Sequence, residues 1–103
     1  MLKAFQAFSI FFVVSLLLAC NSTAQDTQIT TFILVRHAEK VADGSKDPEL
    51  SEQGQARAQR LASMLKRQPI AAIYSTNFKR TMNTVKPLAE KLGQNILPYE
   101  AFK

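Results

Sequence analysis

The fold is decided by the stretch Thr31-Phe32-Ile33-Leu34-Val35-Arg36-His37-Ala38-Glu39-Lys40. Its apolar, β-branched first half predicts a buried strand of a parallel sheet, from about Ile29 to Val35. Ligands of open α/β sheets bind at the carboxyl ends of strands, so Arg36 and His37 follow the strand where chemistry is usually done. His37 is the sole histidine of the chain. A basic pair that merely caps a surface strand is the alternative that this stretch alone leaves open.

The composition allows one domain and limits the ligand classes. The chain has 103 residues and a net charge of +5. With Lys3 set aside as part of a removed segment, 12 basic residues face 8 acidic ones. This excess suits an anionic ligand but is too small and too scattered to indicate nucleic acid. The single cysteine excludes an internal disulfide and a Cys-based zinc site.

The N-terminus has the pattern of an export signal. Residues 1–19 combine one early lysine with an apolar core that is short for a membrane span, which predicts a signal peptide. An uncleaved anchor is the alternative. Leu17-Leu18-Ala19-Cys20 resembles a bacterial lipoprotein signal, although a cysteine that merely ends an apolar run would look the same. We expect Cys20 to be lipidated, residues 20–28 to form a flexible tether, and the protein to be membrane-anchored in the cell envelope, facing the periplasm or the outside.

Helices and strands alternate after the opening stretch. Ser51 is a suitable N-cap for a helix, and Gly54 in its first turn indicates a need for space. An apolar face then recurs with helical spacing at Ala58, Leu61, Ala62 and Leu65. A second strand is expected over residues 70–74. A second helix is expected over residues 78–92, with a kink or break near Val85 because Pro87 lies inside it, and with Gly93 as its C-terminal cap.

A third strand over residues 95–99 completes an order of strand, helix, strand, helix, strand. This order predicts an α/β domain with a parallel sheet and right-handed crossovers. About 75 residues with three strands and two helices cover a parallel sheet poorly. We therefore expect residues 29–103 to be the N-terminal part of a longer α/β domain.

Polar side chains follow the first two strands and can converge on an anion. Arg36 and His37 follow the first strand, and Ser75 follows the second. Arg80 lies in the first turn of the next helix, beside backbone N–H groups that favour an anion. Two guanidinium groups near a histidine make a phosphate or carboxylate pocket, in which a neutral imidazole can attack phosphorus. Arg57 either joins this pocket or is a solvated surface residue. One histidine with scattered carboxylates implies no metal, and the sequence indicates no cofactor.

Three motifs resemble the histidine phosphatase superfamily, also called phosphoglycerate mutase-like. They are Leu34-Val35-Arg36-His37-Ala38-Glu39-Lys40, Leu50-Ser51-Glu52-Gln53-Gly54-Gln55-Ala56 and Ile73-Tyr74-Ser75-Thr76-Asn77-Phe78-Lys79-Arg80-Thr81. They occur in the family's order and span about residues 31–97. The resemblance implies an α/β, parallel-sheet three-layer sandwich, incomplete in this chain.

The resemblance also implies roles for individual residues. His37 would be the nucleophile that takes up the phosphoryl group, and Arg36 and Arg80 would bind phosphate. The family adds a second histidine late in its chain, which this sequence lacks; we expect truncation rather than loss. Glu100 follows the third strand and is either the general acid or an exposed terminal residue. Glu39 is read as a partner that supports His37 or as a loop charge.

Three functions stay open at this point. The leading one is hydrolysis of a small phosphorylated substrate through a phosphohistidine on His37. A phosphoglycerate-mutase-type phosphotransfer is the second. The third is an inactive fragment that binds an oxyanion without turnover, which the missing second histidine favours.

Overall fold

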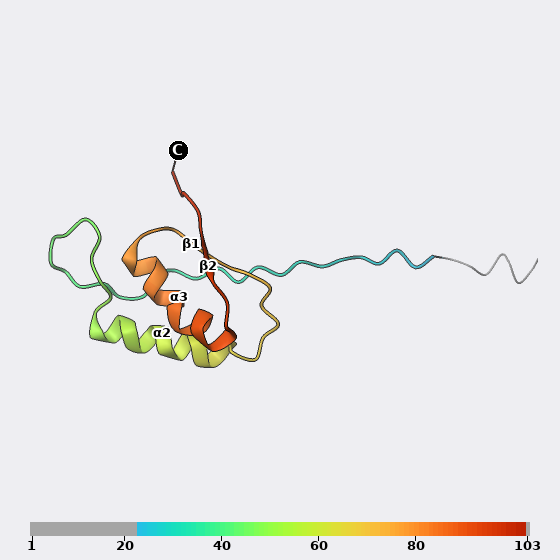
Figure 1. Cartoon of the computed structure of the whole chain (residues 1–103), viewed down its shortest axis with the longest axis horizontal. Helices are drawn as coiled ribbons and strands as arrows, with labels where there is room; N and C mark the ends of the chain where they lie inside the picture. Colours follow the sequence, from blue (N-terminus) through green and yellow to red (C-terminus); the bar gives the residue numbers. More distant parts are fainter. Residues whose placement is uncertain (1–22, 103) are drawn as a thin grey trace, which may run out of the picture. The chain divides into compact units, whose positions relative to one another are not determined.

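The computed structural model of the chain describes residues 23–102. Residues 23–32 and residues 33–102 belong to two different units of the chain. Residues 23–32 of the first unit form no helix or strand. The second unit contains α2 (Glu52–Leu65), β1 (Ile73–Ser75), α3 (Lys79–Leu92) and β2 (Ile96–Pro98) (Figure 1). Within residues 23–102, no helix has the length and apolar character that a membrane crossing needs.

Helix α2 begins and packs as its sequence predicts. The Ser51 hydroxyl accepts a hydrogen bond from the Gly54 N–H at 3.1 Å, which confirms Ser51 as the N-cap. The buried face contains Ala58 and Ala62, two of the predicted positions. A Cβ atom at Gly54 would collide with the backbone carbonyl of Glu39. The glycine therefore saves space for the close approach of α2 to the segment that follows His37.

Helix α3 runs through Pro87 without a break, so the break predicted near Val85 is wrong, while the alternative of a kink there stays a prediction. Proline removes only one backbone hydrogen bond, and the helix packs against α2 and both strands, burying Leu88 and Ala89. This burial holds the turn around Pro87 in helical form. Gly93 ends the helix in the left-handed conformation, with a φ of 63°, as predicted. The Gln94 N–H then donates to the Ala89 carbonyl at 3.0 Å.

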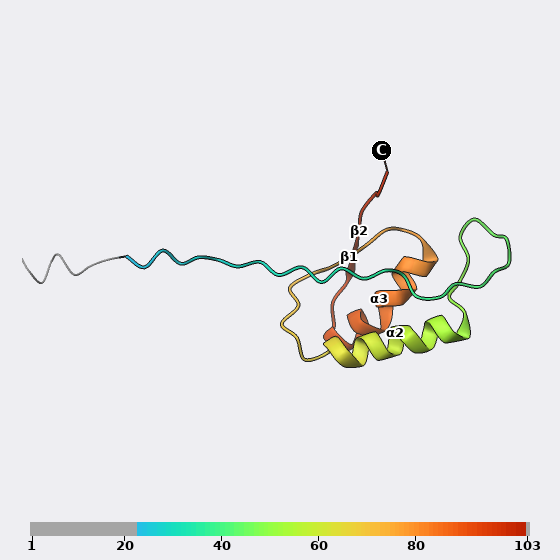
Figure 2. The same cartoon turned by 180° about the vertical axis from the view of Figure 1, so that it is seen from behind.

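The two strands form a parallel sheet that contacts α3. β1 pairs with β2 in the register Ile73–Ile96, Tyr74–Leu97 and Ser75–Pro98. β1, α3 and β2 thus form a βαβ unit, and both views show α2 lying beside α3 (Figures 1 and 2). The main core cluster joins α2, β1 and α3 through Ala62, Ile73, Leu88 and Ala89, and Ile96 of β2 packs against it. The α/β class with a parallel sheet is confirmed.

The predicted first strand, Ile29–Val35, is absent from the described structure. Strands are defined by hydrogen bonds to a neighbour, and β1 and β2 pair only with each other. Without a partner the apolar side chains stay in solvent, and Leu34 is 93% exposed. The composition of this segment is that of a buried strand, but the structure provides no neighbouring strand for it.

Candidate functional site

The His37 ring is oriented by the backbone of the next residue. Its Nδ1 atom lies 2.8 Å from the Ala38 carbonyl oxygen. A carbonyl can only accept a hydrogen bond, so Nδ1 carries the proton in this contact. In the neutral ring the lone pair is then on Nε2, the nitrogen that faces away from the backbone. The histidine is half-buried and Ala38 is buried.

The same residue, Ala38, is tied to helix α3. The Ala38 N–H donates to the Thr84 hydroxyl at 2.8 Å, and that hydroxyl donates to the Arg80 carbonyl at 2.6 Å. Thr84 is buried, with 4% of its surface exposed. These contacts bring together the two predicted halves of the pocket, the segment of His37 and the first turns of α3.

Arg80 is supported by an aromatic ring. Its guanidinium carbon lies 4.3 Å from the centre of the Phe78 ring, which is a cation–π arrangement. The Lys79 N–H at the start of α3 donates to the Asp47 carboxylate at 2.8 Å. Asp47 thus already accepts a hydrogen bond from one of the backbone N–H groups that were predicted to bind a phosphate. The helix N-terminus is shared with a protein carboxylate, a feature that the sequence analysis missed.

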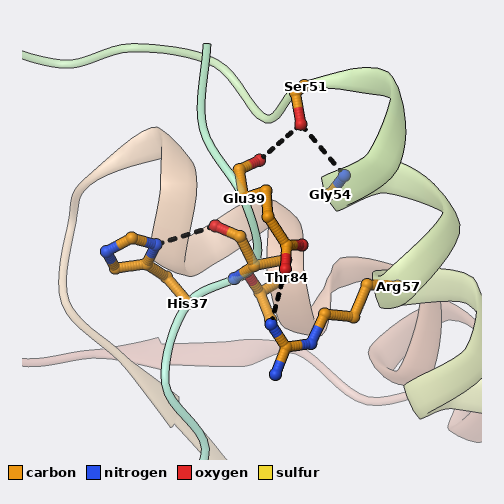
Figure 3. A network of polar contacts seen from close by, with 7 residues as sticks. His37, Glu39, Ser51, Gly54, Arg57 and Thr84 are labelled. Carbon is orange, nitrogen blue, oxygen red and sulfur yellow. Dashed lines mark hydrogen bonds and ion pairs between the residues drawn. The ribbon is translucent and has the colours of Figure 1, made fainter. Parts of the chain in front are cut away.

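Glu39 contacts α2 through both its backbone and its side chain (Figure 3). Its carbonyl accepts hydrogen bonds from the Ser51 N–H at 2.8 Å and from the Ser51 hydroxyl at 3.1 Å. Its carboxylate forms an ion pair with Arg57 at 2.7 Å. The pKa of Glu39 lies below its ordinary value, first because its own backbone N–H stabilises the carboxylate and further because Arg57 is near, while desolvation opposes both.

Arg57 therefore binds a carboxylate of the chain itself, and the proposal that it contacts substrate stays a prediction. In Figure 3 the His37 ring lies on the side of the segment away from the Glu39–Arg57 pair. Arg36 directly precedes His37 and is exposed. Cys20 lies outside the described residues.

Ser75 and Glu100 lie near the ends of the two strands. Ser75 is buried, and its hydroxyl donates to the Thr76 carbonyl at 2.8 Å. The Ser75 carbonyl accepts from the Tyr99 N–H at 3.0 Å, which continues the pairing of the strands by one step. Glu100 follows directly and is exposed. The hydroxyl of Ser75 is used within its own loop, so its predicted contact with substrate would require that bond to open.

A cavity of about 280 Å³ opens between α2 and α3, lined among others by Glu49, Gln59 and Asn83. None of the predicted site residues lines it. Within residues 23–102, no three His, Cys, Asp or Glu side chains gather as a metal site requires. The candidate site is therefore the open surface around His37 rather than this cavity.

Thr84 is the residue of the site that the sequence analysis missed most clearly. It lies four residues after Arg80 and four before the buried Leu88, so helical spacing places all three on one side of α3. A threonine in the buried row of a helix needs a hydrogen-bond partner. That signal was present in the sequence, but it does not identify the partner, Ala38.

Comparison with known proteins assigns the chain to a family. Residues 32–103 match the model of the histidine phosphatase superfamily, branch 1. The chain is 35% identical over 78 residues to phosphoglycerate mutase-like protein 4 of Arabidopsis thaliana, covering 69% of this chain and 34% of that protein. It is 44% identical over 71 residues to phosphoserine phosphatase 1 of Hydrogenobacter thermophilus, covering 63% and 34%.

Solved structures agree with these relatives. A mycobacterial glucosyl-3-phosphoglycerate phosphatase superposes with a TM-score of 0.56 at 26% identity, over 61% of this chain and 32% of that one. Its complex with inorganic phosphate gives 0.54 at 28% identity, over 61% and 31%. The chain spans about a third of the length of these relatives. On the family match and the βαβ unit together, the chain belongs to the histidine phosphatase superfamily.

Proposed function

We propose that this chain carries the nucleophile and phosphate-binding part of a phosphomonoesterase that works through a phosphohistidine on His37. The observation that carries the proposal is the contact between Nδ1 of His37 and the Ala38 carbonyl. It leaves the lone pair of the neutral ring on Nε2, as nucleophilic attack requires. The similarity to proteins named phosphoserine phosphatase and glucosyl-3-phosphoglycerate phosphatase supports a small phosphorylated substrate.

The reaction would proceed in two steps. Nε2 of His37 forms a bond to phosphorus while the phosphorus–oxygen ester bond breaks, and the leaving oxygen takes a proton from an acid, for which Glu100 is the candidate. Water then attacks phosphorus, so that a new phosphorus–oxygen bond forms while the bond to Nε2 breaks. A proton of the water passes to the carboxylate left by the acid, and inorganic phosphate leaves. Arg36 and Arg80 would stabilise the negative charge of the transferring group, which is the main demand of phosphoryl transfer.

Labelling of the full chain tests the nucleophile. The protein is incubated with a ³²P-labelled phosphomonoester, and separately with labelled phosphoramidate, and acid-labile phosphate is mapped by mass spectrometry. We expect label on His37, none on His37→Asn, and labelling about 100-fold slower in Arg80→Gln. Arg60→Gln, an exposed arginine of α2, is the matched control and should label like the wild type. Label that persists in His37→Asn would refute the assignment.

Binding without turnover is favoured by one observation, the lack of a second histidine in the sequence. An unlabelled wild-type chain that still binds inorganic phosphate in a ³¹P NMR titration, with binding lost in Arg80→Gln, would establish this second function. Phosphotransfer of the mutase type would instead appear as movement of the label from His37 to an added alcohol rather than to water.

We further propose that the protein is exported and anchored to a membrane through a lipid on Cys20. The support is the sequence pattern before this cysteine and the absence of large apolar side chains in residues 21–28. The test compares the wild type with Cys20→Ser in a bacterial host. The wild type should sediment with membranes and carry the added mass of acyl chains, and the variant should do neither. Equal masses would refute lipidation.

A further inference from the structure

Ala38 connects His37, the proposed nucleophile, to helix α3 through two hydrogen bonds. Its carbonyl accepts from the His37 ring and its N–H donates to the Thr84 hydroxyl, each at 2.8 Å. Ala38 is 1% exposed, so water does not compete for either group. Any movement of this residue therefore moves the acceptor that fixes the imidazole proton on Nδ1.

The Thr84 hydroxyl acts both as a donor and as an acceptor of hydrogen bonds. A hydroxyl has one proton to donate, and here it goes to the Arg80 carbonyl at 2.6 Å, while a lone pair receives the Ala38 N–H. Thr84 thus connects the backbone of Arg80 to the backbone that orients His37. The Thr84 side chain thereby links two parts of the chain that are 46 residues apart in the sequence.

A second contact holds the same segment from the other helix. The Ser51 hydroxyl accepts from the Gly54 N–H and donates to the Glu39 carbonyl (Figure 3). None of its hydrogen bonds goes to Ala38 or Arg80. Ser51 is therefore a matched control: its loss loosens the segment from α2 without breaking the connection between His37 and α3.

We propose that Thr84 is a positioning residue, whose hydroxyl sets the tautomer of His37 and its placement relative to Arg80. The inference rests on the proposed role of His37 as nucleophile, but its first readout does not. Thr84 does not contact the phosphoryl group and acts only through Ala38 and Arg80. Removing the hydroxyl leaves the Ala38 N–H free to shift and the imidazole free to lose its acceptor.

The test uses the full chain with Thr84→Val, which keeps the shape and loses the hydroxyl, and Thr84→Ser, which keeps the hydroxyl. Because His37 is the sole histidine, the ¹⁵N spectrum of the imidazole contains one ring and needs no assignment by mutation. At about pH 9, where an ordinary imidazole is neutral, the wild type, Thr84→Ser and Ser51→Ala should show the Nδ1–H tautomer. Thr84→Val should show a mixture with Nε2–H.

The second readout is the rate of labelling of His37 by phosphoramidate. We expect Thr84→Val to react about tenfold more slowly than the wild type, and Thr84→Ser and Ser51→Ala to stay within about threefold of it, with circular dichroism confirming helix content in each. A tenfold loss corresponds to about 1.4 kcal/mol in the barrier. Thr84→Ala takes the place of Thr84→Val if the valine variant does not fold.

The outcomes separate this inference from the proposed function. A folded Thr84→Val that keeps the Nδ1–H tautomer and the wild-type rate overturns the positioning role, as does a folded Thr84→Ser that loses the tautomer. If no variant is labelled, wild type included, yet Thr84→Val still changes the tautomer, then Thr84 positions the ring and the phosphohistidine proposal fails.

Discussion

Small residues allow the backbone after His37 to lie against two helices at once. Ala38 and Ala58 are each 1% exposed and share a core cluster with Leu50. Gly54 contributes no side chain, so the Glu39 carbonyl reaches the start of α2. The position of His37, the proposed nucleophile, therefore depends on the small size of these neighbouring residues as much as on its own contacts.

Substitution of Gly54 by alanine should destabilise the protein despite alanine's higher helix propensity. The new Cβ atom would overlap the Glu39 carbonyl, and overpacking of this kind costs about 1–3 kcal/mol. Urea unfolding followed by circular dichroism measures the change. Gln53→Ala, at an exposed neighbouring position, should stay within about 0.5 kcal/mol of the wild type. A Gly54→Ala protein at least as stable as the wild type would show that this close approach does not exist in solution.

Residues that act through local backbone chemistry were predictable, and those that act across the fold were not. Ser51 and Gly54 were identified because capping and space in a first turn are local properties. Thr84 and Asp47 bond to backbone groups 46 and 32 residues away, and no spacing rule links such positions. His37 was identified from its place after an apolar run, but its tautomer required the Ala38 contact.

Among the elements, helix α3 organises the described fold. It packs against α2, β1 and β2, and its first turns include Arg80 and Thr84. Its N-cap residue, Phe78, makes no side-chain capping bond. Asp47, in the loop that precedes α2, supplies the missing acceptor, and Glu49 adds a contact to Lys79 at 3.2 Å. The loop between Lys40 and Leu50 therefore helps to determine where α3 begins.

Removal of this remote cap should weaken α3. Asp47→Ala leaves the Lys79 N–H without its carboxylate and removes a negative charge from the positive end of the helix, and comparable caps contribute about 1 kcal/mol. We expect the unfolding free energy to fall by about that amount in urea denaturation. Asp26→Ala, in the exposed segment before the second unit, is the matched control and should have no measurable effect. Equal stability of the two variants would contradict the capping role of Asp47.

Element types were predictable for both helices and for two of three strands, because helical spacing and apolar runs are local patterns. The observed strands are shorter than the predicted ranges, three residues each. Of the kink or break predicted at Pro87, the break does not occur, because α3 continues through the proline. Packing of α3 on three neighbours decides whether the helix continues, and that information is tertiary.

For the whole molecule, the segment Ile33–Val35 marks the limit of sequence prediction. Its composition predicts a buried strand, yet Leu34 is 93% exposed and Ile33 is 53% exposed. A strand needs a neighbour that donates and accepts hydrogen bonds, and composition cannot report whether that neighbour exists. The family was still identified from the motifs, because these depend on residue identity and order rather than on complete pairing.

Measurements of the stability of the whole chain distinguish a buried strand at residues 33–35 from the exposed segment of the structure. Leu34→Lys should leave the unfolding free energy within about 0.5 kcal/mol of the wild type, since an exposed side chain loses no burial. Leu88→Ala, in the core between α3 and its neighbours, should cost about 2–5 kcal/mol. Both are measured by urea denaturation of the full chain. A loss in Leu34→Lys as large as in Leu88→Ala would mean that the segment packs as a strand in solution.

Hydrogen exchange at the buried Ala38 amide would report how often the contact with Thr84 opens. Its N–H exchanges hydrogen for deuterium only when the bond to Thr84 opens, so its exchange rate measures how often the segment of His37 leaves α3. An oxyanion that binds only when the hydrogen bond between Ala38 and Thr84 is formed would slow this exchange as more of the protein is bound. One amide resonance would therefore report ligand binding at the candidate site, whether or not the chain turns over a substrate.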